Sequence, residues 1–94
     1  MSEENPIGKD LNDLLQVIKT QILFNAGYTL PNILEITESE FTYNKESNLV
    51  TELEIWSDKE RTVGYKSIKP KKKMQRLLGL KVQNFFNKYP SLNS

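Results

Sequence analysis

Two segments of helical periodicity enclose a segment of strand periodicity, and this order constrains the fold more than any other feature. Near the N-terminus, apolar residues recur at spacings of three and four, as on one face of a helix of about four turns. These residues are Leu11, Leu14, Leu15, Ile18 and Ile22. A broader stripe of the same spacing follows Pro70, which suits the first turn of a helix. It contains Met74, Leu77, Leu78, Val82, Phe85, Phe86 and Tyr89.

The sequence also indicates where these helices end and where they are weakened. Gly27 and Pro90 are the expected helix ends, and Asp10 is the expected N-cap of the first helix. Gly79 weakens the second helix by up to about 1 kcal/mol relative to alanine. In the first helix, Val17 and Phe24 form a narrower ridge away from the apolar face. That ridge indicates either packing at the edge of the core or contact with a partner.

The region between the helices is β-prone. Residues 49–56 alternate in polarity, which predicts a half-buried strand. One face carries Leu49, Thr51, Leu53 and Ile55, and the other carries Val50, Glu52, Glu54 and Trp56. The ring of Trp56 is expected over the solvent face or under a loop. Residues 33–37 and 41–44, separated by polar residues 38–40, predict one bent strand or a turn and a strand, and residues 61–68 predict a third strand.

Turns at residues 44–48 and 57–60 connect these strands. The expected fold is therefore a two-layer α+β domain of order α-β-β-β-α, in which a three-stranded antiparallel sheet carries both helices on one face. We expect residues 9–90 to form this single domain, residues 1–8 a flexible N-terminus and residues 91–94 a C-terminal tail.

Composition argues against catalysis. The 94 residues include no cysteine and no histidine, which removes the commonest nucleophile–base pairs and zinc ligands. Glutamates are paired along the predicted strands, at Glu38 and Glu40 and at Glu52 and Glu54, but an exposed strand face ordinarily carries such residues. No apolar run approaches the roughly 18 residues that span a bilayer, and the first four residues are unlike a signal peptide. We expect a non-catalytic protein without a cofactor, in the cytoplasm and not in a membrane.

The charges are sorted along the chain. Residues 1–60 contain all 12 acidic residues and four of the 13 basic ones, a net charge of −8, whereas residues 61–94 contain nine basic residues and no acid. The overall charge of +1 hides this asymmetry. A field of one sign on one element suits a polyanionic partner, and acidic surroundings discourage nonspecific binding elsewhere.

The candidate site is the basic segment around the start of the second helix. It consists of Lys66, Lys69, Lys71, Lys72, Lys73 and Arg76. Lysines at a helix N-terminus oppose the helix dipole, and an anion bound there relieves this opposition, because free N–H and ammonium groups both hold phosphate oxygens. Two other interpretations stay open. The lysines can be an ordinary solvated face, or residues 69–76 can be a nuclear localisation signal.

The element order and this segment together resemble the double-stranded-RNA-binding domain over residues 5–89. Gly64-Tyr65-Lys66-Ser67 followed by Lys71-Lys72-Lys73 resembles that family's third-strand end and lysine-rich helix start, and residues 5–6 and 11–16 resemble its first-helix opening. The resemblance implies that Lys71, Lys72, Lys73 and Lys69 contact phosphates across an RNA major groove. Two features depart from the family: bulky residues replace the alanines of its second helix, and Thr42-Tyr43-Asn44 replaces the proline-histidine loop that reaches the minor groove.

These observations predict a module that binds nucleic acid, RNA or DNA, through the basic segment. The alternative is a small accessory or regulatory protein, similar to phage and mobile-element products, that binds a protein partner or forms a homo-oligomer through its charge asymmetry. Exposure of Trp56, Phe86 or Leu80 favours a protein partner. Burial of these residues, with lysines clear of acids, favours nucleic acid. Glu52 and Glu54 beside the lysines would neutralise them internally.

Overall fold

The computed structural model describes residues 6–93 of the chain. Helices and strands follow in the expected order, and a short helix and a 3-10 turn are added. The elements are α1 (Pro6–Asn25), α2 (Leu30–Leu34), β1 (Glu38–Asn44), β2 (Leu49–Trp56), β3 (Lys66–Ile68), α3 (Lys72–Lys88) and the 3-10 helix η1 (Pro90–Asn93). Of the predicted flexible N-terminus, residues 1–5 lie outside the described residues, and residues 6–8 are helical.

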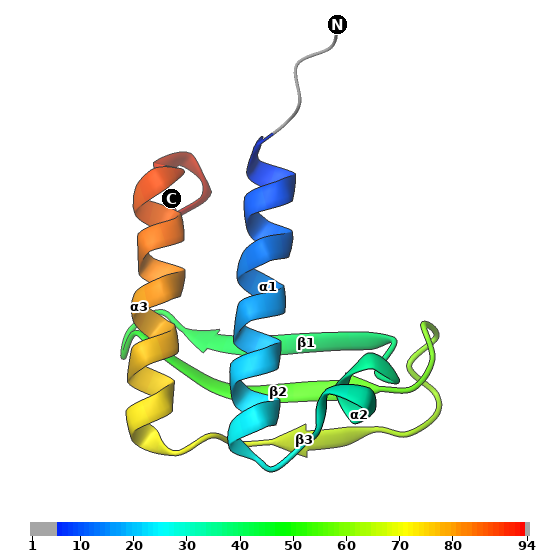
Figure 1. The fold of residues 1–94 in the computed structure, drawn as a ribbon. Helices are drawn as coiled ribbons and strands as arrows, with labels where there is room; N and C mark the ends of the chain where they lie inside the picture. Colours follow the sequence, from blue (N-terminus) through cyan, green and yellow to red (C-terminus); the bar gives the residue numbers. More distant parts are fainter. Residues whose placement is uncertain (1–5, 94) are drawn as a thin grey trace, which may run out of the picture.

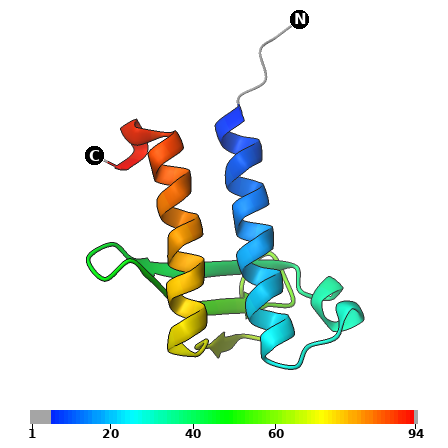
Figure 2. The ribbon, with the colours of Figure 1, turned by 60° about the vertical axis from the view of Figure 1, so that its left-hand side comes forward.

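The molecule has two layers, which confirms the predicted α+β class. The three antiparallel strands form one open sheet in the order β1-β2-β3. Helices α1 and α3 run antiparallel, side by side, across one face of this sheet and extend beyond its β1 edge (Figures 1 and 2). Within the described residues, no helix combines the length and apolar character that crossing a membrane requires.

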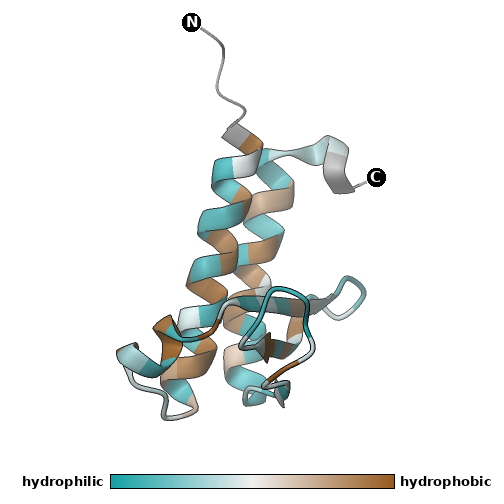
Figure 3. Ribbon diagram, turned by 90° about the vertical axis from the view of Figure 1, so that its right-hand side faces the viewer, coloured by the Kyte–Doolittle hydropathy of each residue, from teal (hydrophilic) through white to brown (hydrophobic). Residues whose placement is uncertain are grey.

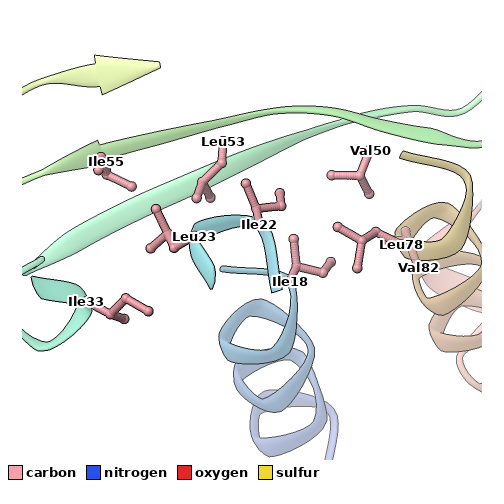
Figure 4. Packing of buried hydrophobic residues seen from close by; sticks show 9 residues of the cluster. All are labelled: Ile18, Ile22, Leu23, Ile33, Val50, Leu53, Ile55, Leu78 and Val82. Carbon is pink, nitrogen blue, oxygen red and sulfur yellow. The ribbon is translucent and has the colours of Figure 1, made fainter. Parts of the chain in front are cut away.

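The core lies between the sheet and the two long helices. Along both helices, hydrophobic and hydrophilic stretches alternate, as helical periodicity requires (Figure 3). The buried cluster contains Ile18, Ile22, Leu23, Ile33, Val50, Leu53, Ile55, Leu78 and Val82, which converge from both helices, from α2 and from β2 (Figure 4). Each such side chain contributes about 1.5–3 kcal/mol of transfer free energy. The central strand β2 is therefore held from one face by all three helices.

A β-bulge changes which residues of β2 face the core. Thr42 pairs with Glu52, but the next residue, Tyr43, pairs with Val50, so Thr51 is the extra residue of the bulge. The bulge shifts the alternation by one, and Val50 joins Leu53 in the core with no exposed surface. The prediction that Val50 shares a face with Glu52 was wrong for this reason.

Of the two alternatives predicted for residues 33–44, one bent strand was wrong, and a turn followed by a strand is closer to the structure, because residues 33–37 form no strand. Residues 33 and 34 belong to helix α2, which has Thr29 in extended conformation at its N-cap and Pro31 near its start, where a proline suits a helix. Ile33 of α2 is buried against the core. Residues 38–40, expected to interrupt the strand, belong to β1, because Glu38 and Glu40 lie on its solvent-facing side.

The third strand is shorter than predicted. Residues 61–65 form a loop, because the Asp58 carboxylate accepts hydrogen bonds from the backbone N–H groups of Thr62 and Val63, both at 2.9 Å. Arg61 and Gly64 take positive φ angles of 63° and 72° in this loop. These backbone bonds fold the chain back over the end of the sheet and leave only Lys66–Ile68 paired as β3.

Two helix details also differ from expectation. Helix α1 begins at Pro6, so Asp10 is not its N-cap. Gly79 is buried within α3 against the turn between β1 and β2, and a Cβ atom there would collide with the backbone carbonyl of Asn48. Gln83 accepts a hydrogen bond from the Asn48 side chain at 2.9 Å, one turn further along. The glycine therefore permits close approach of the helix to the turn.

Candidate nucleic-acid interface

The basic segment runs from β3 through a short linker into the first turns of α3. All six predicted site residues are exposed. Lys69 and Lys71 lie in the linker, and Lys72, Lys73 and Arg76 lie in the first turns of the helix, at the end of the molecule away from the N-terminus of α1 (Figure 1). Because residues three and four apart are neighbours on a helix, Arg76 lies above both Lys72 and Lys73. The structure thus brings five of the six together.

At the start of α3, no acidic side chain offsets the positive end of the helix dipole. Lys71 is the N-cap, with extended backbone angles and no side-chain capping bond, and no acidic residue occupies the first turn. The first helical bond in this turn joins the Gln75 N–H to the Lys71 carbonyl at 2.9 Å. The N–H groups of the preceding residues therefore have no acceptor within the helix, as at every helix start. Lysine ammonium groups add to this positive potential instead of offsetting it.

The acidic residues of the strands lie on the opposite side of the sheet. Since Leu53 and Ile55 face the helices, their strand neighbours Glu52 and Glu54 face away. Glu54 accepts a hydrogen bond from the Tyr65 hydroxyl at 3.0 Å, and Glu52 accepts one from the Ser67 hydroxyl. The bond to Glu54 raises the pKa of Tyr65 above its usual value. Both glutamates therefore have hydrogen-bond partners on the outer face of the sheet.

Arg61 completes this acidic face. Its guanidinium pairs with Glu38 at 2.7 Å and with Glu40 at 2.5 Å. The hydrogen bonds to Glu38 and then to Glu40 raise the pKa of Arg61. The same guanidinium lies 4.5 Å from the ring centroid of Trp56, a cation–π arrangement. Arg61, a cation from the basic part of the sequence, therefore forms ion pairs on the acidic face of the sheet.

The six basic site residues differ from Arg61 in this respect. None of the six basic site residues takes part in an ion pair within residues 6–93. The internal neutralisation of the lysines by Glu52 and Glu54 is therefore absent from the described structure. The paired glutamates of β1 and β2 therefore lie on the outer face of the sheet, whereas the lysine cluster lies at the start of α3.

Lys66 is the basic residue that the structure separates from the others. It pairs with Ile55 across the sheet, on the side that faces the helices. Its Nζ atom lies 5.9 Å from the ring centroid of Tyr28 in the loop after α1. No sequence pattern indicates Tyr28 as a site residue, because only the folded chain brings the loop after α1 beside β3. Gly27, which takes a φ of 98°, marked the turn but not the neighbour.

The apolar groups that were expected to discriminate between partners give a divided result. Trp56 is buried beneath Arg61 and packs against Tyr65, with ring centroids 5.6 Å apart, so it lies under a loop as predicted. Phe86 is half-buried beside Tyr43. Leu80, by contrast, is 53% exposed. The burial of the aromatic rings favours nucleic acid, and the exposure of Leu80 favours a protein partner.

The ridge on α1 is exposed too. Val17 is 39% exposed and Phe24 is 50% exposed. Leu77 of α3, which was assigned to the apolar stripe, is 51% exposed. Packing at the edge of the core therefore covers only part of Val17 and of Phe24.

No group of acidic residues suited to a metal ion occurs among the described residues. The basic segment offers cations and backbone N–H groups, with the Tyr28 ring beside Lys66, and such groups suit an anionic ligand. No family model matches this chain, and neither a curated protein nor a solved structure matches it in sequence or fold.

Proposed function

We propose that this chain is a non-catalytic module that binds nucleic acid through the basic start of α3. The observation that supports the proposal most directly concerns Lys69, Lys71, Lys72, Lys73 and Arg76. All five are exposed and form no ion pair with another of the residues that the structure describes, while the glutamates of β1 and β2 have partners on the outer face of the sheet. An ordinary solvated lysine face does not require this separation. Such a module would act in the cytoplasm, or in the nucleus of a eukaryotic cell.

The ligand is recognised by its phosphates. Lysines and N–H groups at a helix start bind phosphate oxygens without reading base sequence. Binding then releases counterions, so the affinity falls steeply as salt rises. The resemblance to the double-stranded-RNA-binding domain implies RNA as the ligand, and the loop that replaces that family's histidine argues for contact from the helix start and not from the minor groove, so the strand form of the ligand is left to experiment.

The test is a titration of fluorescent duplex RNA, duplex DNA and single strands at two salt concentrations. The variant replaces Lys71, Lys72 and Lys73 together by glutamine, which removes about three phosphate contacts and is expected to weaken binding by about 100- to 1,000-fold at 0.1 M salt. The slope of log K against log salt should flatten by about 2 to 3. Thermal stability should barely change, because the substitutions are on the surface.

The matched control replaces Lys9, Lys45 and Lys59 by glutamine, which removes the same net charge from exposed positions outside the basic segment. Retained binding by this control, with loss in the first variant, assigns the contact to the start of α3. Equal weakening in both variants would reduce the effect to net charge, and the absence of binding at low salt would overturn the proposal.

The second candidate function is docking to a protein, and the exposed apolar residues on the outer side of the helices favour it. These are Val17, Phe24, Leu77 and Leu80. If nucleic acid fails to bind, replacement of Leu77 and Leu80 by serine, followed by measurement of the oligomeric state, is the next experiment. A dimer that dissociates on this change would establish self-association.

A further inference from the structure

A cleft of about 510 Å³ lies beside the basic segment, between the end of α1, helix α2 and the ends of β2 and β3. The fold opens it because β3 is only three residues long and the chain turns away at Gly27 before α2 begins. Gly64, at a φ of 72°, lines one side against Ser57, and a Cβ there would collide with the Ser57 hydroxyl. A volume of this size falls in the range of small-molecule sites.

The groups at the cleft combine an aromatic ring, a cation and hydrogen-bonding side chains. Tyr28 and Lys66 both line it, with the Lys66 Nζ atom 5.9 Å from the Tyr28 ring centroid. Asn32 lines it as well, and its Oδ1 atom accepts a hydrogen bond from the Thr29 hydroxyl at 2.7 Å, which leaves the amide NH₂ group to donate. Glu35 adds an exposed carboxylate outside every ion pair of residues 6–93.

These groups match the parts of a nucleotide. A tyrosine ring offers a stacking surface for a base, a lysine binds the phosphate, and amide and carboxylate groups bind donors and acceptors on a base edge. The cleft also continues the phosphate contacts proposed above. Lys66 and Lys69 are three residues apart, so their Cα atoms are at most about 11 Å from each other.

From this arrangement we propose that the cleft binds one unpaired nucleotide of the same nucleic acid strand whose backbone contacts the start of α3, with the base on Tyr28 and the phosphate on Lys66. This inference rests on the proposed function and narrows it. A base inside a continuous duplex cannot enter a cleft without leaving its stack. The protein should therefore prefer single strands, or duplexes with a bulged base, over uninterrupted duplexes.

The experiment has two readouts. In the first, the backbone amides of Gly27, Gly64 and Lys66 are followed by NMR while AMP, CMP, GMP or UMP is added to the full chain. In the second, single-stranded and duplex oligonucleotides are titrated against Tyr28→Ala and against Tyr65→Ala. Tyr65 is the matched control, since it is an exposed tyrosine on the outer face of the sheet.

We expect the three amides to shift with at least one mononucleotide. Tyr28→Ala should weaken single-strand binding by about 10-fold or more, the usual loss for one stacked base, and should change duplex binding less than twofold. Tyr65→Ala should change neither. Since Tyr28 also packs beside the core, Tyr28→Phe, which keeps the ring, provides the second variant and should keep single-strand binding.

The outcomes separate this inference from the proposed function. In the variant with Lys71, Lys72 and Lys73 replaced by glutamine, the amides should still shift with mononucleotides while duplex binding is lost. If duplexes and single strands bind equally well, Tyr28→Ala matches Tyr65→Ala and no mononucleotide shifts the cleft amides, the inference is overturned and the proposed function stands. If no oligonucleotide binds at low salt, both are overturned.

Discussion

The two ends of α3 carry the same kind of residue in opposite circumstances. At the C-terminal end, the Lys88 ammonium lies 2.7 Å from an Asp10 carboxylate oxygen, and the Tyr89 hydroxyl donates to the same carboxylate. Lys88 also complements the negative end of the helix dipole. At the N-terminal end, Lys72 and Lys73 oppose the dipole and form no ion pair with any acid of residues 6–93. One end joins two helices, and the other presents charge to solvent.

The difference distinguishes cations that stabilise the fold from cations that do not. A cation that contributes to folding is expected to have a partner or a favourable dipole, as Lys88 has both. A cluster that lacks both lowers the stability of the folded chain slightly. Such a cluster is consistent with selection for binding, because proteins tolerate small losses of stability where function requires them. The comparison makes the start of α3 the stronger candidate site.

Charge reversal at the two ends gives the largest expected difference. The double variant Lys72→Glu, Lys73→Glu should lower the affinity for nucleic acid by on the order of 1,000-fold. It should also raise the thermal stability, because acidic residues in the first turn interact favourably with the helix dipole. Lys88→Glu should do the opposite, lowering stability and sparing most of the binding. Titration and thermal unfolding of both variants measure the two effects. If Lys88→Glu weakens binding as strongly as the double variant does, the two ends of α3 do not differ in their contribution to binding.

The middle of α3 gives the next effect. Gly79→Ala places a Cβ against the Asn48 carbonyl, and we expect the free energy of unfolding to fall by about 1–3 kcal/mol despite the better helix propensity of alanine. Gly8→Ala in α1 is the control, since its Cβ meets nothing within 4 Å. There the propensity gain of up to about 1 kcal/mol should appear as added stability. Urea unfolding compares the two, and equal stabilisation would mean that α3 does not need the close approach.

Gly79 also shows where prediction from sequence stops. Helical spacing predicted α3, and polarity alternation predicted β2 within its observed bounds, because both patterns are local. The contact between Gly79 and Asn48 joins distant segments, and propensity alone marked the glycine only as a weak point. The bulge at Thr51 was likewise invisible, since nothing in residues 49–52 signals an extra residue before the strand has paired with β1.

The candidate site also has a part that the sequence indicates and a part that it does not. The lysines were found from sequence, because a run of cations without acids is a linear feature. The freedom of these lysines from Glu52 and Glu54 was an open question, and it needed the strand register to place those acids on the other face of the sheet. Tyr28 and Asn32 carried no signal at all. They become neighbours of Lys66 only when the loop after α1 and helix α2 fold beside β3.

The smallest effect is expected at the joined end of α3. Hydrogen bonds from Lys88 and then from Tyr89 lower the pKa of Asp10 below its usual value of 3.8. A carboxylate with a lowered folded pKa contributes stability above the unfolded pKa, and this stability is lost as pH falls through the folded pKa. The melting temperature should therefore drop below about pH 4 by a few degrees at most, since the pair is exposed.

Asp10→Asn isolates this contribution. The variant should melt slightly below the wild type at pH 7, and the gap should narrow as pH falls through the lowered pKa of Asp10, where the wild-type carboxylate becomes protonated. The wild type and the variant should both still lose stability in acid, because hydrogen bonds from the Thr62 side chain and the Val63 N–H also lower the pKa of Asp58. A gap that stays unchanged down to the lowest pH at which both proteins are folded would mean that the Asp10 contact stabilises α3 through packing, and then the two ends of the helix would differ in geometry more than in charge.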